Sequence, residues 1–142
     1  MKITLSMNEV LERLYAITAL HGYVNETTTA RAGRILSPAQ APALQVAVKS
    51  AFGTALSYLM FSGWEADTSL GQLGAQAPDD IGLDSATAAE RLAQAVVGLT
   101  LYAVYSGGVD SRAKAAYAQA VEALQSLSAE CYRPMRLAAS YL

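Results

Sequence analysis

Charged side chains are unusually few in this sequence. Asp, Glu, Lys and Arg make up 15% of the 142 residues, whereas hydrophobic residues make up 53%. In an ordinary domain about a quarter of the residues are charged. The formal net charge of −2 argues against a nucleic-acid partner, which would require a basic face. So few charges on a small domain leave much apolar surface, and we expect part of it to be buried between subunits.

Cysteine and histidine occur once each. Cys131 cannot form a disulfide or a cysteine-based metal site within one chain, and its apolar helical setting favours a packed thiol. His21 stands at the end of an apolar stripe, where an imidazole usually complements the helix dipole. The chain has no nucleophile elbow, HExxH motif or phosphate loop. We therefore expect no enzyme, no catalytic residue, no cofactor and no metal site.

A small acidic group precedes the third predicted helix. Asp79, Asp80 and Asp84 could offer oxygen ligands to a hard cation. Their spacing lacks the glycine and the terminal glutamate of a calcium loop. We interpret them as solvated residues that supply helix caps.

Long hydrophobic runs are also lacking. Asn8, Glu9 and Glu12 interrupt the N-terminal stretch, which therefore does not resemble a secretory signal. The uncharged stretch 92–109 contains Gln94, and its purely apolar part is too short to cross a bilayer. We expect a cytoplasmic protein without a membrane partner.

Helical periodicity is what the chain does have. It predicts an all-α, four-helix bundle-like single domain over residues 1–142, with helices at about 7–21, 39–62, 86–106 and 111–132. The first helix follows a capping box of Ser6 and Glu9 and ends at Gly22. The second begins near Ser37 and Pro38 and ends at Gly63.

The second helix has one clear apolar side, with further apolar residues next to it. The main stripe consists of Leu44, Val48, Ala51, Ala55 and Leu59. Phe52, Leu56 and Met60 lie beside that stripe. The second helix is thus apolar over more than one stripe, and a stripe that the bundle does not bury would need a partner.

The third and fourth helices are predicted to form an antiparallel hairpin. The third is apolar over most of its circumference, through Leu92, Val96, Leu99 and Ala103 and a neighbouring stripe. The fourth has a seam of alternating four- and three-residue spacing at Ala113, Tyr117, Ala120, Leu124, Leu127 and Cys131. We expect Leu99 and Leu124 to face each other's helices and to be buried.

The ends of these two helices have their own signals. Ser85 or Thr87 is expected to cap the third helix, which ends at the glycine pair 107–108. Asp110 is expected to cap the fourth helix, and Pro134 to end it.

The segment 64–84 has no helical period and contains several glycines. We expect it to be irregular, with 71–81 as its most mobile part because nothing periodic holds it. The first five residues alternate in polarity and predict a short strand or an extended arm.

A candidate interface follows from the placement of aromatic and basic residues. Tyr58, Phe61 and Trp64 gather at the end of the second helix, where such residues are usually core but can anchor a contact. Arg133 and Arg136 follow the fourth helix and could meet an acidic partner or complement its dipole. Four helices leave no central position, so the second apolar stripe of a helix would need a partner, of which another copy is the simplest.

The layout after residue 85 resembles a known group of proteins. An apolar helix, a glycine break, a charged helix and the ending Cys131-Tyr132-Arg133-Pro134-Met135-Arg136 resemble small all-α phage and prophage virion proteins of the head–tail junction or tail. The resemblance covers about the last third of the chain and assigns no functional residue. It implies a non-enzymatic, self-assembling virion component, assembled in the cytoplasm, whose partners are itself or other virion proteins.

A second function remains open on the sequence. Tyr58, Tyr102 and Tyr105 lie toward the ends of the second and third helices. Tyrosines lining a deep pocket beside a carboxylate would instead indicate a small-molecule-binding bundle or an enzyme.

Overall fold

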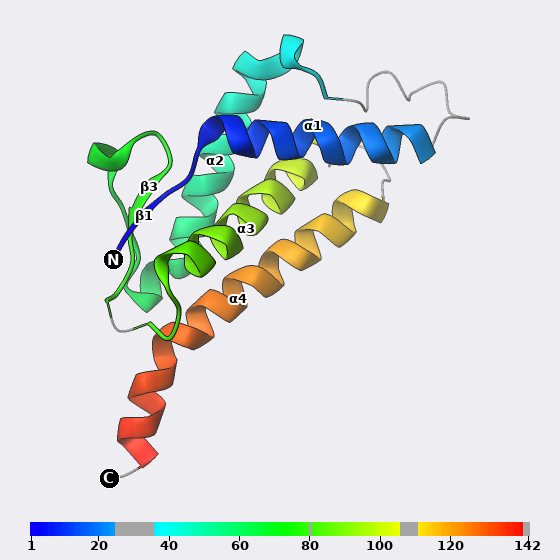
Figure 1. Ribbon diagram of the computed structural model, residues 1–142. Helices are drawn as coiled ribbons and strands as arrows, with labels where there is room; N and C mark the ends of the chain where they lie inside the picture. The colour runs from blue at the N-terminus through cyan, green and yellow to red at the C-terminus, as the bar shows by residue number, and fades with distance from the viewer. Residues whose placement is uncertain (25–35, 80, 106–110, 141–142) are drawn as a thin grey trace.

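The computed structural model describes residues 1–24, 36–79, 81–105 and 111–140, with side chains for 1–19, 36–79, 81–105 and 113–129 (Figure 1). Within these residues it has four α-helices: α1 Met7–Val24, α2 Ala41–Leu59, α3 Ser85–Tyr105 and α4 Ser111–Ser140. The short elements are β1 Lys2–Thr4, η2 Pro38–Gln40, η3 Met60–Ser62, β2 Glu65–Ala66, η4 Thr68–Leu70 and β3 Gly74–Gln76. The predicted all-α, four-helix fold is confirmed, with a small sheet added to it.

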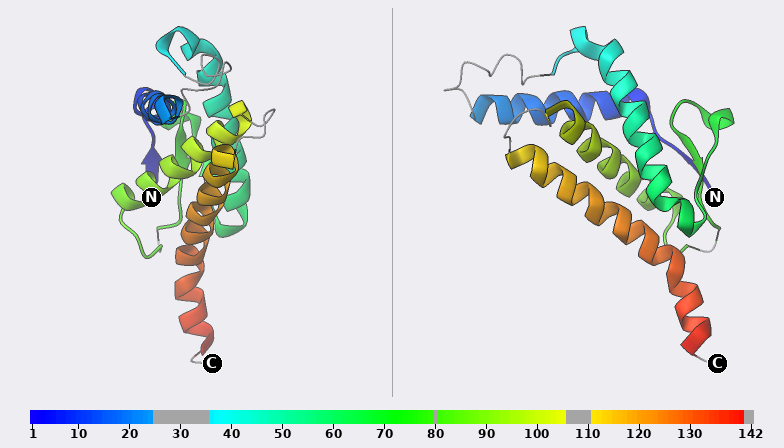
Figure 2. Two further views of the ribbon diagram at one scale, coloured as in Figure 1. Left: turned by 90° about the vertical axis from the view of Figure 1, so that its right-hand side faces the viewer. Right: turned by 180° about the vertical axis from the view of Figure 1, so that it is seen from behind.

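α3 is the central helix of the bundle. It contacts α1, α2, α4 and β1, and Figure 2 shows it lying between α1 and α2. Residues 95–101 are buried without interruption, which only a helix covered on all sides can achieve. The expectation that four helices leave no central position is therefore wrong, because the sheet and α1 cover the sides that α2 and α4 leave open.

The predicted hairpin of α3 and α4 is confirmed. Leu99 and Leu124 are both buried, as are four of the six predicted seam residues: Ala113, Ala120, Leu124 and Leu127. Tyr117, on the same seam, is exposed and its ring lies 4.6 Å from the ring of Tyr102. Arg91 adds a hydrogen bond of 2.6 Å from its guanidinium to the Ser126 hydroxyl. The contact is made by small and branched apolar side chains with polar links at its edge.

The main stripe of α2 is buried as predicted, together with Phe52 and Leu56. Met60, on the 3₁₀ turn η3 that follows α2, lies on the side opposite the buried stripe and is exposed. Gly63 ends the turn in the left-handed conformation with φ of 89°, as expected of a C-terminal glycine.

The segment 64–84 is more ordered than its sequence predicts. β3 pairs antiparallel with both β1 and β2, in the order β1-β3-β2. Leu73, Ala75 and Ala77 are buried in the core. The expectation that 71–81 lacks periodic structure is therefore wrong for residues 74–76, which pair with two strands. Strands this short carry too few residues to show an alternating pattern in the sequence. The predicted mobility of 71–81 stays a prediction. The short strand expected within the first five residues is confirmed.

Helix ends follow side-chain and backbone hydrogen bonds more than single glycines or prolines. Ser6 accepts from the Glu9 N–H, 3.3 Å away, as the predicted capping box requires. α1 continues past Gly22 and α4 past Pro134, so both predicted ends are wrong. A glycine only weakens a helix, and a proline can be accommodated with a bend. The predicted end of α3 and the Asp110 cap lie outside the described residues.

Asp84 begins α3 in place of the predicted caps Ser85 and Thr87. Its carboxylate accepts a hydrogen bond of 2.7 Å from the Thr87 N–H, one of the free amides of the first turn. The hydrogen bonds from the Thr87 side chain and backbone hold the pKa of Asp84 below its ordinary value. Aspartate and serine are both good N-cap residues, so the sequence pattern alone does not decide whether Asp84 or Ser85 caps the helix.

Candidate interaction surface

Trp64 is buried, although the sequence places it at an interface. Only 1% of its surface is exposed. The Gly63 N–H donates to Met60 O at 3.1 Å and the Trp64 N–H to Leu59 O at 3.3 Å. This pattern closes the helix end and folds the chain back over it, which carries the indole into the core. The prediction of Trp64 as an interface residue is therefore wrong.

The same turn leaves its other large side chains outside. Phe61 is 82% exposed, Met60 60% and Tyr58 43%. Phe61 and Tyr58 are thus accessible for contact, as a candidate interface requires. Two of the three aromatic residues predicted for the interface therefore lie at the surface, and the third, Trp64, packs in the core beneath the turn.

A further exposed apolar side chain lies earlier on α2. Val46 is 68% exposed, and apart from Lys49 the residues between Val46 and Met60 on this side are small. We define the α2 face as the exposed residues on this side: Val46, Lys49, Ser50, Gly53, Thr54, Ser57, Met60 and Phe61. Lys49 is its only charged residue. In the view from behind in Figure 2, this helix lies in front of α3.

Two of the three hydroxyl groups of the α2 face donate hydrogen bonds within the helix. Thr54 donates to Ser50 O at 3.1 Å, and Ser57 donates to Gly53 O at 3.0 Å. These side chains therefore offer few donors to solvent. The outward side of α4 is different, because its exposed residues include Lys114, Gln119, Glu122 and Gln125. Low polarity distinguishes the α2 face from that outer surface.

Arg133 and Arg136 lie on the end of α4, residues 130–140, which projects beyond the bundle (Figure 1). Their side chains lie outside the described residues. The base of this projecting end is near the α2 face, because Ser62 in η3 and Ser128 in α4 share a hydrogen bond of 2.8 Å. The predicted aromatic and basic candidates thus come from adjacent elements.

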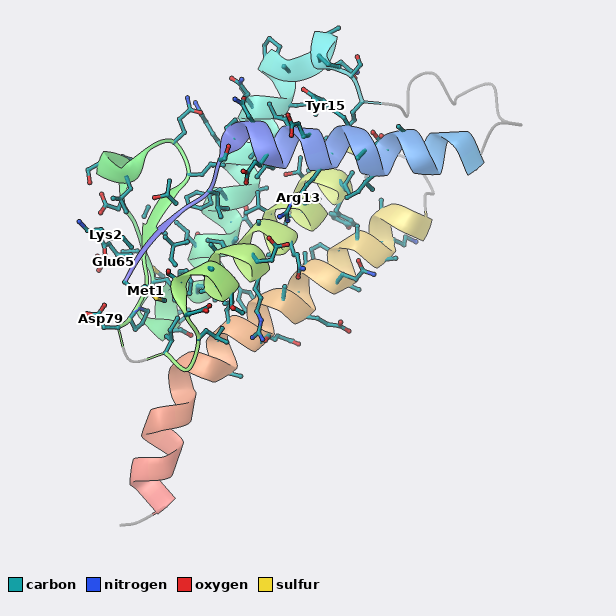
Figure 3. All side chains as sticks on the ribbon, in the orientation of Figure 1. Met1, Lys2, Arg13, Tyr15, Glu65 and Asp79 are labelled. Carbon is teal, nitrogen blue, oxygen red and sulfur yellow. The ribbon has the colours of Figure 1, made fainter. Side chains whose placement is uncertain are left out.

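A small pocket of about 120 Å³ lies between the starts of α1 and α3. Arg13 crosses it to bond Glu90 at 2.6 Å, and Figure 3 shows Arg13 between the two helices. The hydrogen bond to Glu90 raises the pKa of Arg13. A drug-sized ligand needs about 300 Å³ or more, so this pocket is too small for one. We interpret this site as a link between α1 and α3.

The acidic residues before α3 do not converge. Asp84 caps α3, and Asp79 bonds the Met1 amino group at 2.5 Å, at the edge labelled in Figure 3. Asp80 lies outside the described residues. Among the residues described, no three metal-ligating side chains lie together. The interpretation of this group as a source of helix caps is confirmed for Asp84.

The tyrosines of the alternative function are spread over the bundle. Tyr102 is exposed and contacts Tyr117 on α4, whereas Tyr58 lies at the end of α2. Neither lines the pocket between α1 and α3, and nor does Tyr105. The tyrosine-lined pocket stays a prediction.

Two further sequence candidates, His21 and Cys131, have side chains outside the described residues. No helix in the described part of the chain is long and apolar enough to cross a membrane. Comparisons with protein-family models, curated proteins and solved structures found no match. A proposal for the function therefore rests on the surface of the described residues.

Sequence reasoning missed the central part of the α2 face. Val46, Gly53 and Met60 recur at seven-residue intervals on the side opposite the buried stripe. That spacing was available as a signal, because a heptad of low polarity on an outward face is typical of a helix contact. It was obscured by Met60, whose side chain fits an inward stripe equally well by type.

Proposed function

We propose that the protein is a non-enzymatic structural subunit that assembles with copies of itself through the α2 face. The exposure of Val46, Met60 and Phe61 on a helix with one charge carries this proposal. Met60 and Phe61 are adjacent, and Val46 lies about 21 Å away on the same side of the helix, at 1.5 Å per residue. Exposed large apolar side chains grouped on one side of a protein commonly indicate an interaction surface. Residues 95–101 of α3, whose apolar circumference first suggested assembly, are covered within the subunit, whereas Tyr102 and Val104 at its end are exposed.

The energetics favour reversible association. Burying a Val, Met or Phe side chain contributes about 1.5–3 kcal/mol each. Association costs about 4–15 kcal/mol in lost translational and rotational freedom. A contact between the same face of two copies would bury six such side chains, three from each copy, or about 9–18 kcal/mol. Because this gain is similar in size to the cost, we expect association that is reversible and depends on concentration.

The finer proposal is a component of a phage or prophage virion, at the head–tail junction or in the tail. It rests on the resemblance of the chain from residue 85 onward. The projecting end of α4, which carries Arg133 and Arg136, supports it as a possible arm toward a neighbouring subunit. The genes beside this one provide the test: capsid, portal or tail genes support a virion role, and a metabolic operon contradicts it.

Self-assembly is tested by sedimentation equilibrium over a wide concentration range. We expect reversible association of the wild type and at least about tenfold weaker association of Phe61→Glu, because a charge would be buried at the contact. Gln119→Glu adds the same charge to the outward side of α4 and should leave association unchanged. A wild type that stays monomeric at high micromolar concentration would contradict the proposal.

A further inference from the structure

The two edges of strand β1 differ in their hydrogen bonds. The Leu5 N–H donates to Leu73 O at 2.9 Å, and the backbone groups of the odd-numbered residues of β1 face β3 in the same way. Successive residues of an antiparallel strand alternate in this respect. The N–H and C=O groups of Lys2 and Thr4 therefore point away from β3, and no backbone hydrogen bond joins them to a described residue.

The free edge of β1 is the outer edge of the sheet, whose order is β1-β3-β2. The side chains of Lys2 and Thr4 are exposed, and that of Ile3 between them is buried. A row of unpaired backbone donors and acceptors is a template for another extended chain. A strand added antiparallel here would exchange both backbone hydrogen bonds with Lys2 and with Thr4. The chemistry of this edge thus selects an extended peptide as its ligand.

The pocket between α1 and α3 begins where β1 ends. Its volume is about 120 Å³, and its lining includes Thr4, Leu5, Val10, Ala86 and Ala89. An apolar cavity of about 150 Å³ holds a benzene molecule, so this pocket accommodates one aliphatic side chain. Residues opposite each other in a sheet direct their side chains to the same face. In an added strand, the residue opposite Leu5 would therefore direct its side chain into the pocket.

Charge differs between the two ends of β1. Lys2 stands at its start and forms no ion pair with a described residue. Beyond its end, the pocket lining has two carboxylates, Glu9 and Glu90, and one guanidinium, that of Arg13. Figure 3 shows Lys2 at the start of β1 and Arg13 beyond its end. Complementary charge therefore favours an acidic residue beside Lys2 and a basic residue near Glu9.

We propose that β1 binds an extended peptide as an added antiparallel strand, whose residues are in order basic, apolar, β-branched, apolar and acidic. The antiparallel direction gives the more stable pairing per residue. The basic residue then lies near Glu9, and the first apolar residue lies opposite Leu5. The β-branched residue pairs with Thr4, the second apolar residue lies opposite Ile3, and the acidic residue lies beside Lys2. This site is separate from the α2 face and does not depend on self-assembly.

A second copy of β1 fits the same edge less well. In a two-fold antiparallel pair, Lys2 of one copy would face Thr4 of the other, and neither end would gain an opposite charge beside it in the strand. Lysine on a short edge strand is also a common device against pairing between copies. We therefore treat pairing of two β1 strands as an outcome that the experiment must detect.

An NMR titration of the ¹⁵N-labelled protein with the peptide acetyl-Lys-Val-Thr-Val-Glu-amide tests the site. In the millimolar range we expect the amide signals of Lys2 and Thr4 to shift and their hydrogen exchange to slow, because these N–H groups gain a partner. The amide of Ile3, which faces β3, should change less. Absence of a shift at Lys2 and Thr4 in that range would overturn the proposal.

Methylation of single peptide nitrogens tests the pairing without changing the protein. A methyl group on the Thr or the Glu nitrogen should weaken binding by about tenfold or more, because these N–H groups face β1. A methyl group on either Val nitrogen should have little effect, because those groups face away. Equal losses at all four nitrogens would overturn the added-strand geometry.

A charge exchange tests the predicted place of the acidic residue. Replacing the final Glu of the peptide with Lys should weaken binding to the wild type by at least about threefold. The variant Lys2→Glu should bind this altered peptide more tightly than the original one, and because Lys2 is exposed the variant should keep its fold. The same preference in both proteins would contradict the assignment. Shifts of the Lys2 and Thr4 amides when the protein alone is concentrated would show that a second copy pairs with β1, and would overturn the proposal.

Discussion

The contact between α3 and α4 and the outward face of α2 use the same kinds of residue with different results. In the first, Gly98 lets α4 approach, and the seam residues around it are buried. In the second, Gly53 lies between exposed apolar side chains and no described atom occupies the space above it. The comparison shows that the structural role of a glycine in a helix depends on which element packs against it. The α2 face has such a glycine with no described side chain across from it, and self-association through this face is our proposal.

The largest expected effect on stability distinguishes the buried Trp64 from the exposed Phe61, which lie on opposite sides of the turn after α2. Trp64→Ala should lower the free energy of unfolding by about 3–5 kcal/mol, because it leaves a cavity in the core. Phe61→Ala should change it by less than about 0.5 kcal/mol, because its side chain is exposed. Chemical denaturation of both variants measures the difference at dilute concentration. Equal losses would mean that Phe61 also supports the fold of the subunit.

The variant Leu124→Ala tests the packed contact between α3 and α4. Leu124 is buried against α3, so its truncation should cost about 2–5 kcal/mol. Leu99→Ala, on the opposing helix, should fall in the same range. An unchanged denaturation midpoint in both variants would remove the hairpin of α3 and α4 from this account.

A smaller loss is expected for Gly98→Ala. The added methyl group would meet Ala116 and Ala120 on α4 at less than contact distance. Overpacking of this kind costs about 1–3 kcal/mol, partly offset by the better helix propensity of alanine. Thermal unfolding with Ala118→Gly as a control for propensity would measure the net effect. A more stable Gly98→Ala variant would show that the helices can separate freely.

The stability of the sheet is expected to depend on pH through Asp67. Hydrogen bonds from Ser69 and Gln76 lower the pKa of Asp67. A carboxylate with a depressed folded pKa stabilises the fold above its unfolded pKa of about 3.9, and this stabilisation is lost as pH falls through the folded pKa. Asp67→Asn should therefore be less stable than the wild type at neutral pH, and the two should converge on acidification. A constant difference across that range would contradict the shift.

The sequence predicts the helical part of the fold well and the sheet poorly. The stripe from Leu44 to Leu59 and the seam from Ala113 to Leu127 identify the packed faces because a long helix repeats its pattern several times. β2 and β3 contain only two and three residues, and their pairing depends on contacts with β1, which is distant in the chain. Trp64 shows a related limit, since the direction of a side chain after a left-handed glycine follows from tertiary packing.

The candidate surface was predicted only at its edge. Phe61 and Tyr58 stand out by residue type, whereas the middle of the α2 face consists of Ser50, Gly53 and Ser57, which resemble an ordinary solvated surface. Their significance depends on knowing which side of α2 is outside and that Gly53 has open space above it. Both facts require the packing of the other helices.

The most direct test of the α2 face is Gly53→Leu, measured for folding and for association in the same samples. Replacing glycine should stabilise the isolated subunit by about 0.5–1 kcal/mol, because leucine favours the helix and has room. The side chain would also add apolar surface, which favours non-specific association, yet it would project from the middle of the α2 face and hold the two contacting surfaces apart. The account predicts a higher denaturation midpoint together with association at least about tenfold weaker by sedimentation equilibrium, with Ala118→Leu on α4 unchanged in association. Association as strong as in the wild type, with folding intact, would contradict the account.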